Sequence, residues 1–383
     1  MPGCGRGWRC PPIPGDQGDE QKLKVYQNSQ DHVPVHYAPL DHPRRGGTYE
    51  AIQDLFQAAR IADAIEKNDV VAIKVHFGEL GNTRYLRPIL IRRLAELVKA
   101  AGGRPFVTDT TTLYKHHRHD LFRHLENARA NGFTPETLGC PVIIADGLCN
   151  NGVEVAVEGN QLMPGVTVAQ AIYDADMIIN AAHLTLHHEF LWAGAVKAIG
   201  MGCTTKQMKL LMHTAAGKPS FCAQDCVNCG LCLKYCPGEA FQRENGRIAF
   251  DVQKCLGCGD CFAFCTGEAL QLAWGEAGAE LVLRTAECAR GVLSTFGPGK
   301  AWHFLFAVDV TENCDCIGDS AGRPITPDLG LLLSEDVAAV DLAALDLAVE
   351  AGALGGKAEA ALSFKALIAE SVLQSRRYAV HPT

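Results

Sequence analysis

Two runs of cysteine between Cys226 and Cys265 constrain the fold of this 383-residue chain more than any other feature. In each run three cysteines are separated by two residues, and a fourth follows after three more. The sequence around the cysteines also recurs, because CVNCGLCLKYCPGEAF aligns with CLGCGDCFAFCTGEAL. The segment is therefore an internal repeat, and the repeated spacing indicates a shared role in binding.

The spacing is typical of iron–sulfur ligands. Three thiolates two residues apart can bind three iron corners of a cubane from one tight loop, so the fourth ligand must come from elsewhere. In bacterial two-cluster ferredoxins, the fourth cysteine of each run ligates the other cluster. We therefore expect two [4Fe–4S] clusters, held by Cys226, Cys229, Cys232 and Cys265 and by Cys255, Cys258, Cys261 and Cys236.

Other uses of these cysteines fit less well. Zinc usually takes two C-x2-C pairs per site rather than three close cysteines and a fourth. Disulfides are disfavoured because the N-terminal residues 1–20 have no apolar signal core, and seventeen cysteines then indicate a reducing, cytoplasmic environment. Thr266 replaces Pro237 of the first run, a departure that removes no ligand.

Composition narrows the possible partners. The chain is 48% hydrophobic and 20% charged, a typical balance for a globular protein. Its formal net charge of −8 disfavours nucleic acid as a partner, and no apolar run approaches the length of a membrane span. Residues 1–20 are rich in glycine and proline and are expected to be a disordered lead-in. The expected partners are a redox protein, a small-molecule substrate or both.

The rest of the chain alternates β-rich and helical patterns. We predict strands at Asp69–His76, Arg104–Asp109, Pro141–Asp146, Asp176–Ala181, His303–Val310 and Leu329–Leu333. We predict helices at Tyr85–Ala101, Ala169–Tyr173 and Trp192–Ile199, and another that Ser334 caps, with Glu335 and Asp336 in its first turn. The fold class is α/β, with a mostly parallel sheet flanked by helices. Residues 21–219 and 276–383 would form one α/β domain, into which a ferredoxin-like α+β domain at 220–275 is inserted.

Polar residues follow several predicted strands. In open α/β sheets, ligands bind at the carboxyl ends of strands. The candidates for catalysis are Lys74, His76, His183, His187, Cys314 and Cys316. We expect them to converge at one rim of the sheet, beside one cluster, although they are equally compatible with scattered residues that share no pocket.

Alternatives stay open for four of these residues, and one nearby run is not expected to form a site. Cys314 and Cys316 are too close in sequence for a routine disulfide, so they would be small buried residues or ligands of a further metal ion. His183 and His187 could also bind a metal from one helical face. The histidine-rich run Lys115–His124 is predicted to be a solvated helix face rather than a site.

Several segments together resemble a known family. They are VAIKVHFGELGNTRYLRP, PFVTDTTTLY, His183–Cys203, the cysteine repeat and Cys314-Asp315-Cys316. This set resembles the uncharacterised Fe–S center proteins, a domain of unknown function that carries an inserted ferredoxin unit. The resemblance implies [4Fe–4S] binding and an α/β body, and it implies no substrate.

Three functions remain compatible with the sequence. The first is an iron–sulfur oxidoreductase whose clusters exchange electrons with a small molecule held in the α/β domain. The second is an electron carrier or adaptor between protein partners, with no catalytic site of its own. The third is an assembly or sensing protein in which Cys203, Cys314 and Cys316 handle a labile metal. Neither G-x-G-x-x-G after a strand nor a P-loop is present, so a nucleotide cofactor is not supported.

Overall fold

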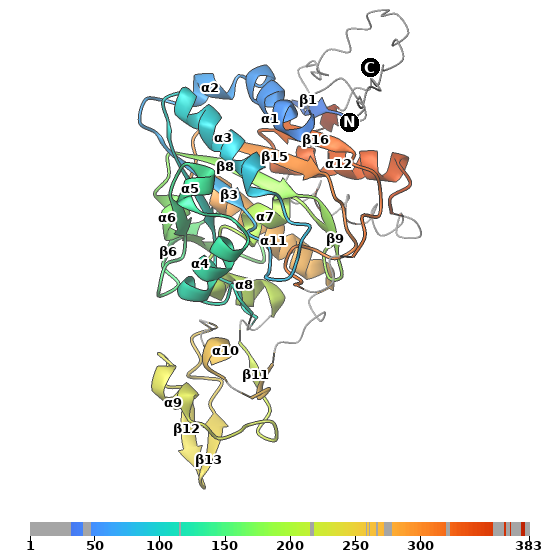
Figure 1. Ribbon diagram of the computed structural model, residues 1–383. Helices are drawn as coiled ribbons and strands as arrows, with labels where there is room; N and C mark the ends of the chain where they lie inside the picture. The colour runs from blue at the N-terminus through green and yellow to red at the C-terminus, as the bar shows by residue number, and fades with distance from the viewer. Residues whose placement is uncertain are drawn as a thin grey trace, which may run out of the picture.

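The computed structural model consists of a larger α/β body and a smaller lobe, which lies below α8 in the view of Figure 1. It describes residues 32–40, 47–114, 116–214, 218–257, 259, 261–265, 267–271, 278–318, 322–354, 364, 368 and 377–379. The expected lead-in at residues 1–20, together with Lys115, Cys258 and Thr266, lies outside the described residues.

A seven-stranded sheet forms the centre of the body. Its order is β2 (His36–Ala38), β16 (Gly330–Ser334), β15 (Ala301–Ala307), β8 (Met177–His183), β3 (Val70–Val75), β4 (Arg104–Asp109) and β5 (Val142–Ile144). The five strands from β15 to β5 are parallel, and β16 is antiparallel to both of its neighbours. The predicted mostly parallel α/β sheet is confirmed.

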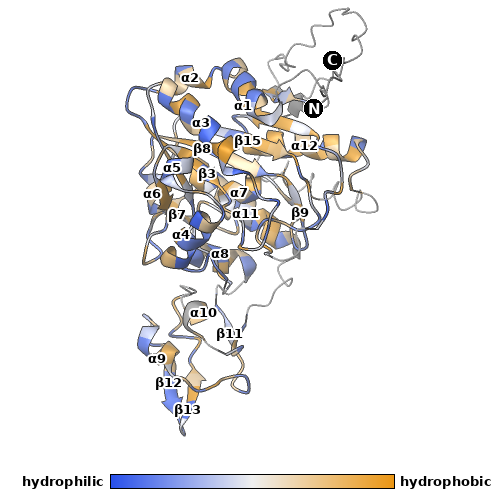
Figure 2. Cartoon of the chain, viewed as in Figure 1, coloured by the Kyte–Doolittle hydropathy of each residue, from blue (hydrophilic) through white to orange (hydrophobic). Residues whose placement is uncertain are grey.

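Helices cover both faces of this sheet, because its strands are apolar on both sides. One core joins Ala72, Ile178 and Leu305 to α11 (Gly278–Leu293) and α12 (Val337–Glu350). The alternate strand positions pack against α1 (Gly47–Ala58) and α3 (Pro88–Ala100) in a second core. Figure 2 shows the central strands in the colours of apolar residues. Smaller helices complete these layers: α2 (Ile61–Ala64), α4 (Leu121–Ala130), α5 (Pro135–Leu138), α6 (Gln170–Tyr173), α7 (Ala195–Gly200) and α8 (Lys206–His213).

Short strand pairs lie outside the central sheet. They are β1 (His32–Pro34) with β17 (Arg377–Ala379), β6 (Gly152–Ala156) with β7 (Gly165–Ala169), and β9 (Thr185–His187) with β10 (Leu191–Ala193). Among the described helices, even the sixteen-residue α11 lacks the length and apolar character of a membrane span.

Two helix predictions need correction. The predicted helix Trp192–Ile199 is instead a strand followed by α7, because Trp192 pairs with Leu186 in the β9–β10 hairpin. Helix α12 is capped by Asp336 rather than by Ser334, since the Asp336 carboxylate accepts from the amides of Ala338 and Ala339 at 2.9 Å. Ser334 is the last residue of β16.

The smaller lobe contains the cysteine repeat. It is built from β11 (Ser220–Phe221) paired with β14 (Leu270–Gln271), the hairpin of β12 (Phe241–Glu244) and β13 (Arg247–Phe250), α9 (Leu231–Tyr235) and α10 (Cys261–Phe264). Strand β8 precedes this lobe and β15 follows it, yet the two strands are neighbours in the central sheet. The chain therefore leaves the body, forms the lobe and returns to complete the same sheet.

Two side chains of the body join the apolar core of the lobe. Leu113, from the loop after β4, and Leu210, from α8, pack with Phe241, Ile248 and Phe262. Six of the repeat's cysteines are partly buried against this core: Cys226, Cys232, Cys236, Cys255, Cys261 and Cys265. The lobe is therefore in apolar contact with the body beside the loop that follows β4.

Candidate active site

A cavity of about 410 Å³ opens where β3, β4 and β8 end. Its volume lies within the usual range for small-molecule sites. The structure brings all six predicted site residues together there, since the lining includes Lys74, His76, His183, His187, Cys314 and Cys316. They meet because the carboxyl ends of neighbouring parallel strands share one edge of the sheet.

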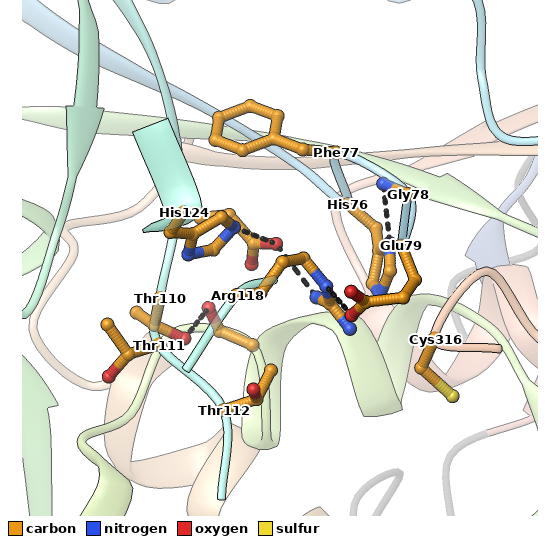
Figure 3. A network of polar contacts seen from close by, with 12 residues as sticks. His76, Phe77, Gly78, Glu79, Thr110, Thr111, Thr112, Arg118, His124 and Cys316 are labelled. Carbon is orange, nitrogen blue, oxygen red and sulfur yellow. Dashed lines mark hydrogen bonds and ion pairs between the residues drawn. The ribbon is translucent and has the colours of Figure 1, made fainter. Parts of the chain in front are cut away.

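A buried network of charges forms one wall of the cavity. Asp109 lies 3.4 Å from Lys74 Nζ and 3.4 Å from Arg118 Nη1, and Arg118 Nε lies 3.3 Å from Glu79 Oε2. Figure 3 shows the Arg118 guanidinium facing Glu79. Burial alone would raise the pKa of Asp109, but the positive charges of Lys74 and Arg118 outweigh it and lower the pKa. This wall holds its own charges in fixed pairs.

The predicted solvated helix at Lys115–His124 is wrong. Arg118, His119 and His124 are buried, and α4 begins only at Leu121. Arg118, which precedes this helix, lines the cavity, and its carbonyl accepts a 3.0 Å hydrogen bond from the Thr112 amide. Burial lowers the pKa of His124 to about 3. The prediction failed because Arg118 is compensated by Glu79 and Asp109. Both carboxylates lie outside this run, so the periodicity of the run does not reveal them.

His183 holds a loop instead of facing a ligand. Its Nδ1 lies 2.9 Å from Asp315 Oδ2, and its Nε2 lies 2.8 Å from the Val308 carbonyl. A carbonyl and a carboxylate both accept, so both ring nitrogens donate and the ring is an imidazolium. Burial opposes the charge, but Asp315 outweighs burial and raises the pKa of His183. His183 therefore anchors the loop that carries Cys314 and Cys316.

His76 and His187 are held in the neutral form that carries its proton on Nε2. The Gly78 amide donates to His76 Nδ1 at 3.0 Å, as Figure 3 shows. The amides of Glu189 and Phe190 both donate to His187 Nδ1 at 3.1 Å. Burial, followed by nearby positive charges, lowers the pKa of both rings. Each can therefore donate a hydrogen bond from Nε2 to a bound group.

Lys197 is a cavity residue that the sequence interpretation did not select. It lies on α7, whose first amides, those of Ala195 and Val196, donate to the Asp341 carboxylate at 2.6 and 2.9 Å. Burial, together with the charge of Arg118, lowers the pKa of Lys197 to about 7. It is the third residue of α7, four residues after β10 ends at Ala193, and the helix predicted over Trp192–Ile199 concealed this strand end.

The Cys314 and Cys316 side chains are joined in a disulfide, contrary to the expectation that they are too close for one. Their Cα atoms are 5.3 Å apart, an ordinary separation for a disulfide. Their sulfur atoms and a ring nitrogen of His187 lie within 4.8 Å of one another, the one group of this kind among the described residues. Metal-bound histidines usually donate from their other nitrogen. His187 Nδ1 accepts instead, so a metal ion fits this group poorly.

In the lobe, one cavity is lined by cysteines of both runs. Cys226, Cys229 and Cys232 of the first run face it together with Cys265 of the second run. Backbone amides approach the sulfur atoms of the other set, since Ala240 N lies 3.3 Å from Cys236 Sγ and Gly257 N lies 3.4 Å from Cys255 Sγ. The lobe therefore places three cysteines of one run beside the last cysteine of the other.

Comparison with known proteins identifies the family. The family profile described as "Domain of unknown function (DUF362)" matches residues 71–346. The chain belongs to the DUF362 family. This establishes the coarser part of the predicted resemblance, and the iron–sulfur part stays a proposal. A comparison with curated proteins found no match.

Two solved structures are similar to this DUF362 chain at low identity. One is the lactate racemase apoprotein from Thermoanaerobacterium thermosaccharolyticum, with 11% identity, a TM-score of 0.34, and coverage of 69% of this chain and 49% of that one. The other is a Thermotoga maritima protein, with 7% identity, a TM-score of 0.37, and coverage of 66% and 50%. This chain thus spans about half the length of each, and TM-scores below 0.5 carry no argument about function.

Proposed function

We propose that this DUF362 protein is an iron–sulfur redox enzyme that binds two [4Fe–4S] clusters and exchanges electrons with a small anionic molecule in the body's cavity. The observation that carries the proposal is the position of Leu113. This side chain lines the cavity and also belongs to the apolar core of the cysteine-rich lobe. A small-molecule site and an electron source would thus share a wall.

The lobe's cysteines fit cubane clusters better than single ions. Thiolate ligands of one tetrahedral zinc ion would lie roughly 3.8 Å apart, given a Zn–S distance of about 2.3 Å. Among the described residues, the group of three or more ligand atoms within 4.8 Å of one another lies in the body, not in the lobe. Cys226, Cys229, Cys232 and Cys265 surround a cavity instead, and this arrangement supports the crossed ligand set.

The second cluster would lie beside the body. Its proposed ligands are Cys236, Cys255, Cys258 and Cys261, and Gly259 lies among them. A Cβ atom at Gly259 would lie 3.1 Å from Leu113 Cδ2 and 3.4 Å from Lys206 Cγ. Any side chain there would press on the body, so glycine permits the close approach. When bound, such clusters supply single electrons, often at low potential.

The charges of the body's cavity favour an anionic ligand. Two of the lining carboxylates are paired with cations, Asp109 with Lys74 and Arg118 and Asp315 with His183. The third, Glu189, lies 3.9 Å from His213 Nε2. Lys197 also faces the cavity, and no described carboxylate lies within 4.0 Å of its Nζ in an ion pair. A buried ammonium without a counter-ion is costly, so a bound anion would relieve that cost.

The chain's own groups could bind and protonate this ligand. Lys197 would pair with its negative charge, and His76 and His187 would donate hydrogen bonds from Nε2. A group whose pKa is about 7 is also suited to deliver a proton near neutral pH, and Lys197 is such a group. His183 would keep the Cys314–Cys316 loop in place and would not contact the ligand.

Anaerobic purification of the full chain tests the proposal. We expect about eight irons and eight sulfides per chain, four of each for every cubane. The reduced protein is then mixed with small carboxylates and oxoanions, and recovery of the cluster absorbance reports electron transfer. Lys197→Gln should slow that recovery without changing the iron count. Lys67→Gln, at an exposed site, is the matched control. Bound zinc in place of iron would contradict the proposal.

An electron-carrier function is the second candidate, and one surface feature favours it. Val227 and Leu256 occupy matching positions in the two cysteine runs and are 63% and 59% exposed. Exposed apolar residues beside both proposed clusters could dock a redox partner. Under this alternative, a partner protein would re-oxidise the clusters and no small anion would, in both the parent chain and Lys197→Gln.

A further inference from the structure

The Cys314–Cys316 disulfide differs in environment from the other cysteines of the body. It lines the cavity, whereas Cys140, Cys203 and Cys288 are buried within the body. Burial raises the pKa of the Cys140 thiol to about 11 and that of Cys203 to about 12. Such thiols are unreactive because the thiolate is the reactive form. The disulfide alone combines a cavity position with polar neighbours among these cysteines.

The neighbours of the disulfide favour a thiolate at Cys314. Lys197 Nζ lies 3.9 Å from Cys314 Sγ, and the Cys316 amide donates to the same sulfur at 3.4 Å. A ring nitrogen of His187 lies within 4.8 Å of both sulfur atoms. Positive charge and amide donors stabilise a thiolate, so Cys314 is the better leaving group when the S–S bond breaks.

The loop that carries the disulfide is anchored independently of the S–S bond. Its Asp315 carbonyl accepts from the Glu79 amide at 2.8 Å, and its Ile317 carbonyl accepts from Asn82 Nδ2 at 3.0 Å. His183 holds the Asp315 side chain from the other side. The two sulfur atoms would therefore stay adjacent after reduction, which is the requirement for a reversible pair.

We propose that Cys314 and Cys316 form a redox-active dithiol–disulfide pair in the wall of the cavity. On reduction the S–S bond breaks, and the pair takes up two electrons and two protons to give two thiols. A low-potential one-electron donor supplies the two electrons in two successive transfers through the cluster site of the proposed function, and Lys197 and solvent supply the two protons. Re-forming the bond returns two electrons and two protons to an oxidised substrate in the cavity.

Thiol labelling of the full chain tests the pair. The native protein is equilibrated anaerobically with mixtures of reduced and oxidised dithiothreitol, then acid-quenched and alkylated with N-ethylmaleimide. Trypsin cleaves after Lys300 and, because it does not cut the Arg323–Pro324 bond, next after Lys357. In the released peptide 301–357, Cys314 and Cys316 are the only cysteines. We expect this peptide to gain both labels together along a two-electron titration curve, and to lose both when oxidant is restored. Dithionite with methyl viologen, as a one-electron donor, should give the same two labels in the cluster-loaded chain.

Variants separate a reactive pair from a structural bond. In the reduced protein, labelling at pH 7 should be several-fold slower in Lys197→Gln than in the parent chain, and unchanged in Lys67→Gln. Cys316→Ser should leave Cys314 as a reactive thiol that labels in the native state. A disulfide that excess dithiothreitol reduces only after denaturation would overturn the proposal. So would a reduced pair protected from the label by one bound metal ion per chain.

The dithiothreitol titration requires neither clusters nor substrate, so its failure is distinguishable from failure of the proposed function. A chain with about eight irons and no reducible pair would refute the pair alone. If the pair is reducible but the chain binds no iron, the clusters are not its electron source, and the proposed function is refuted.

Discussion

The cysteine lobe and the cavity of the body assemble their sites by opposite routes. The lobe draws its cysteines from two short runs, and the cavity that Cys226 and Cys265 share lies within one small unit. The cavity of the body joins Lys74 to Cys316, residues that only the sheet brings together. Local spacing therefore defines the first site, whereas the second depends on the whole fold. The comparison predicts that damage to the lobe stays local and that damage to the sheet removes the body's site entirely.

The largest expected effect is loss of folding when the chain ends at Lys218. Such a chain lacks β15 and β16, and β8 would lose its partner on one side. We expect no cooperative urea transition and no native fold, because the second half of the central sheet is missing. A stable, cooperatively unfolding product would show that the body does not need the segment after the lobe.

The next effect concerns the lobe alone. Cys236→Ala should remove one cluster, the one whose other proposed ligands are Cys255, Cys258 and Cys261, and lower the iron count from about eight to about four. The body should unfold at an unchanged urea concentration. Cys149→Ala, at an exposed free cysteine, is the control and should keep all the iron. Loss of the cluster held by Cys226, Cys229 and Cys232 would overturn the crossed assignment.

A third change tests the buried charge network of the body. Asp109→Asn removes the carboxylate shared by Lys74 and Arg118, leaving two buried cations with less compensation. Breaking a buried pair in this way costs about 3–5 kcal/mol in the free energy of unfolding. Asp63→Asn, which breaks an exposed pair with Arg60, should cost less than about 1 kcal/mol. If urea denaturation showed equal losses in the free energy of unfolding for the two variants, burial would not make the Asp109 pairs more important than the exposed Arg60–Asp63 pair.

The pH dependence of anion binding gives a smaller effect. Lys197 loses its proton as the pH rises through about 7, so the affinity for a small anion should be greatest below that value. Above it, affinity should fall by up to about tenfold per pH unit. Lys197→Gln should weaken binding by about tenfold at pH 6 and remove this dependence, as isothermal titration would measure. A parent chain whose affinity is flat from pH 6 to 8 would exclude Lys197 as the binding cation.

The smallest effect concerns the pairing of His183 with Asp315. The pKa of His183 is raised in the folded protein. Its pairing therefore contributes fully below the unfolded value of about 6.5, and the contribution is lost as the pH rises through the folded value. His183→Gln should destabilise the protein by about 2 kcal/mol at pH 6 and by less at higher pH, as measured by urea unfolding. A difference that grows with pH would contradict the imidazolium assignment.

Much of the fold was predictable because its signals are local. Strand β4 was predicted with its correct bounds, and β3 and α3 within a few residues, since β-branched runs and a proline in the first helical turn mark them. The break between β10 and α7 was not predictable. It depends on the pairing of Trp192 with Leu186 and on the Asp341 carboxylate that holds the start of α7.

The sequence by itself determined the cysteine spacing, the α/β alternation and the six polar residues at strand ends, because each is a pattern among neighbours in the chain. Only the tertiary structure decided which of these polar side chains are buried, charged or bonded to one another. Both ring nitrogens of His183 are hydrogen-bonded to groups on other loops. Arg118 is buried between two carboxylates that are far from each other in the sequence. Lys197 faces the Cys314–Cys316 disulfide. Burial and charge compensation depend on groups far apart in sequence, and periodicity along the chain carries no information about them.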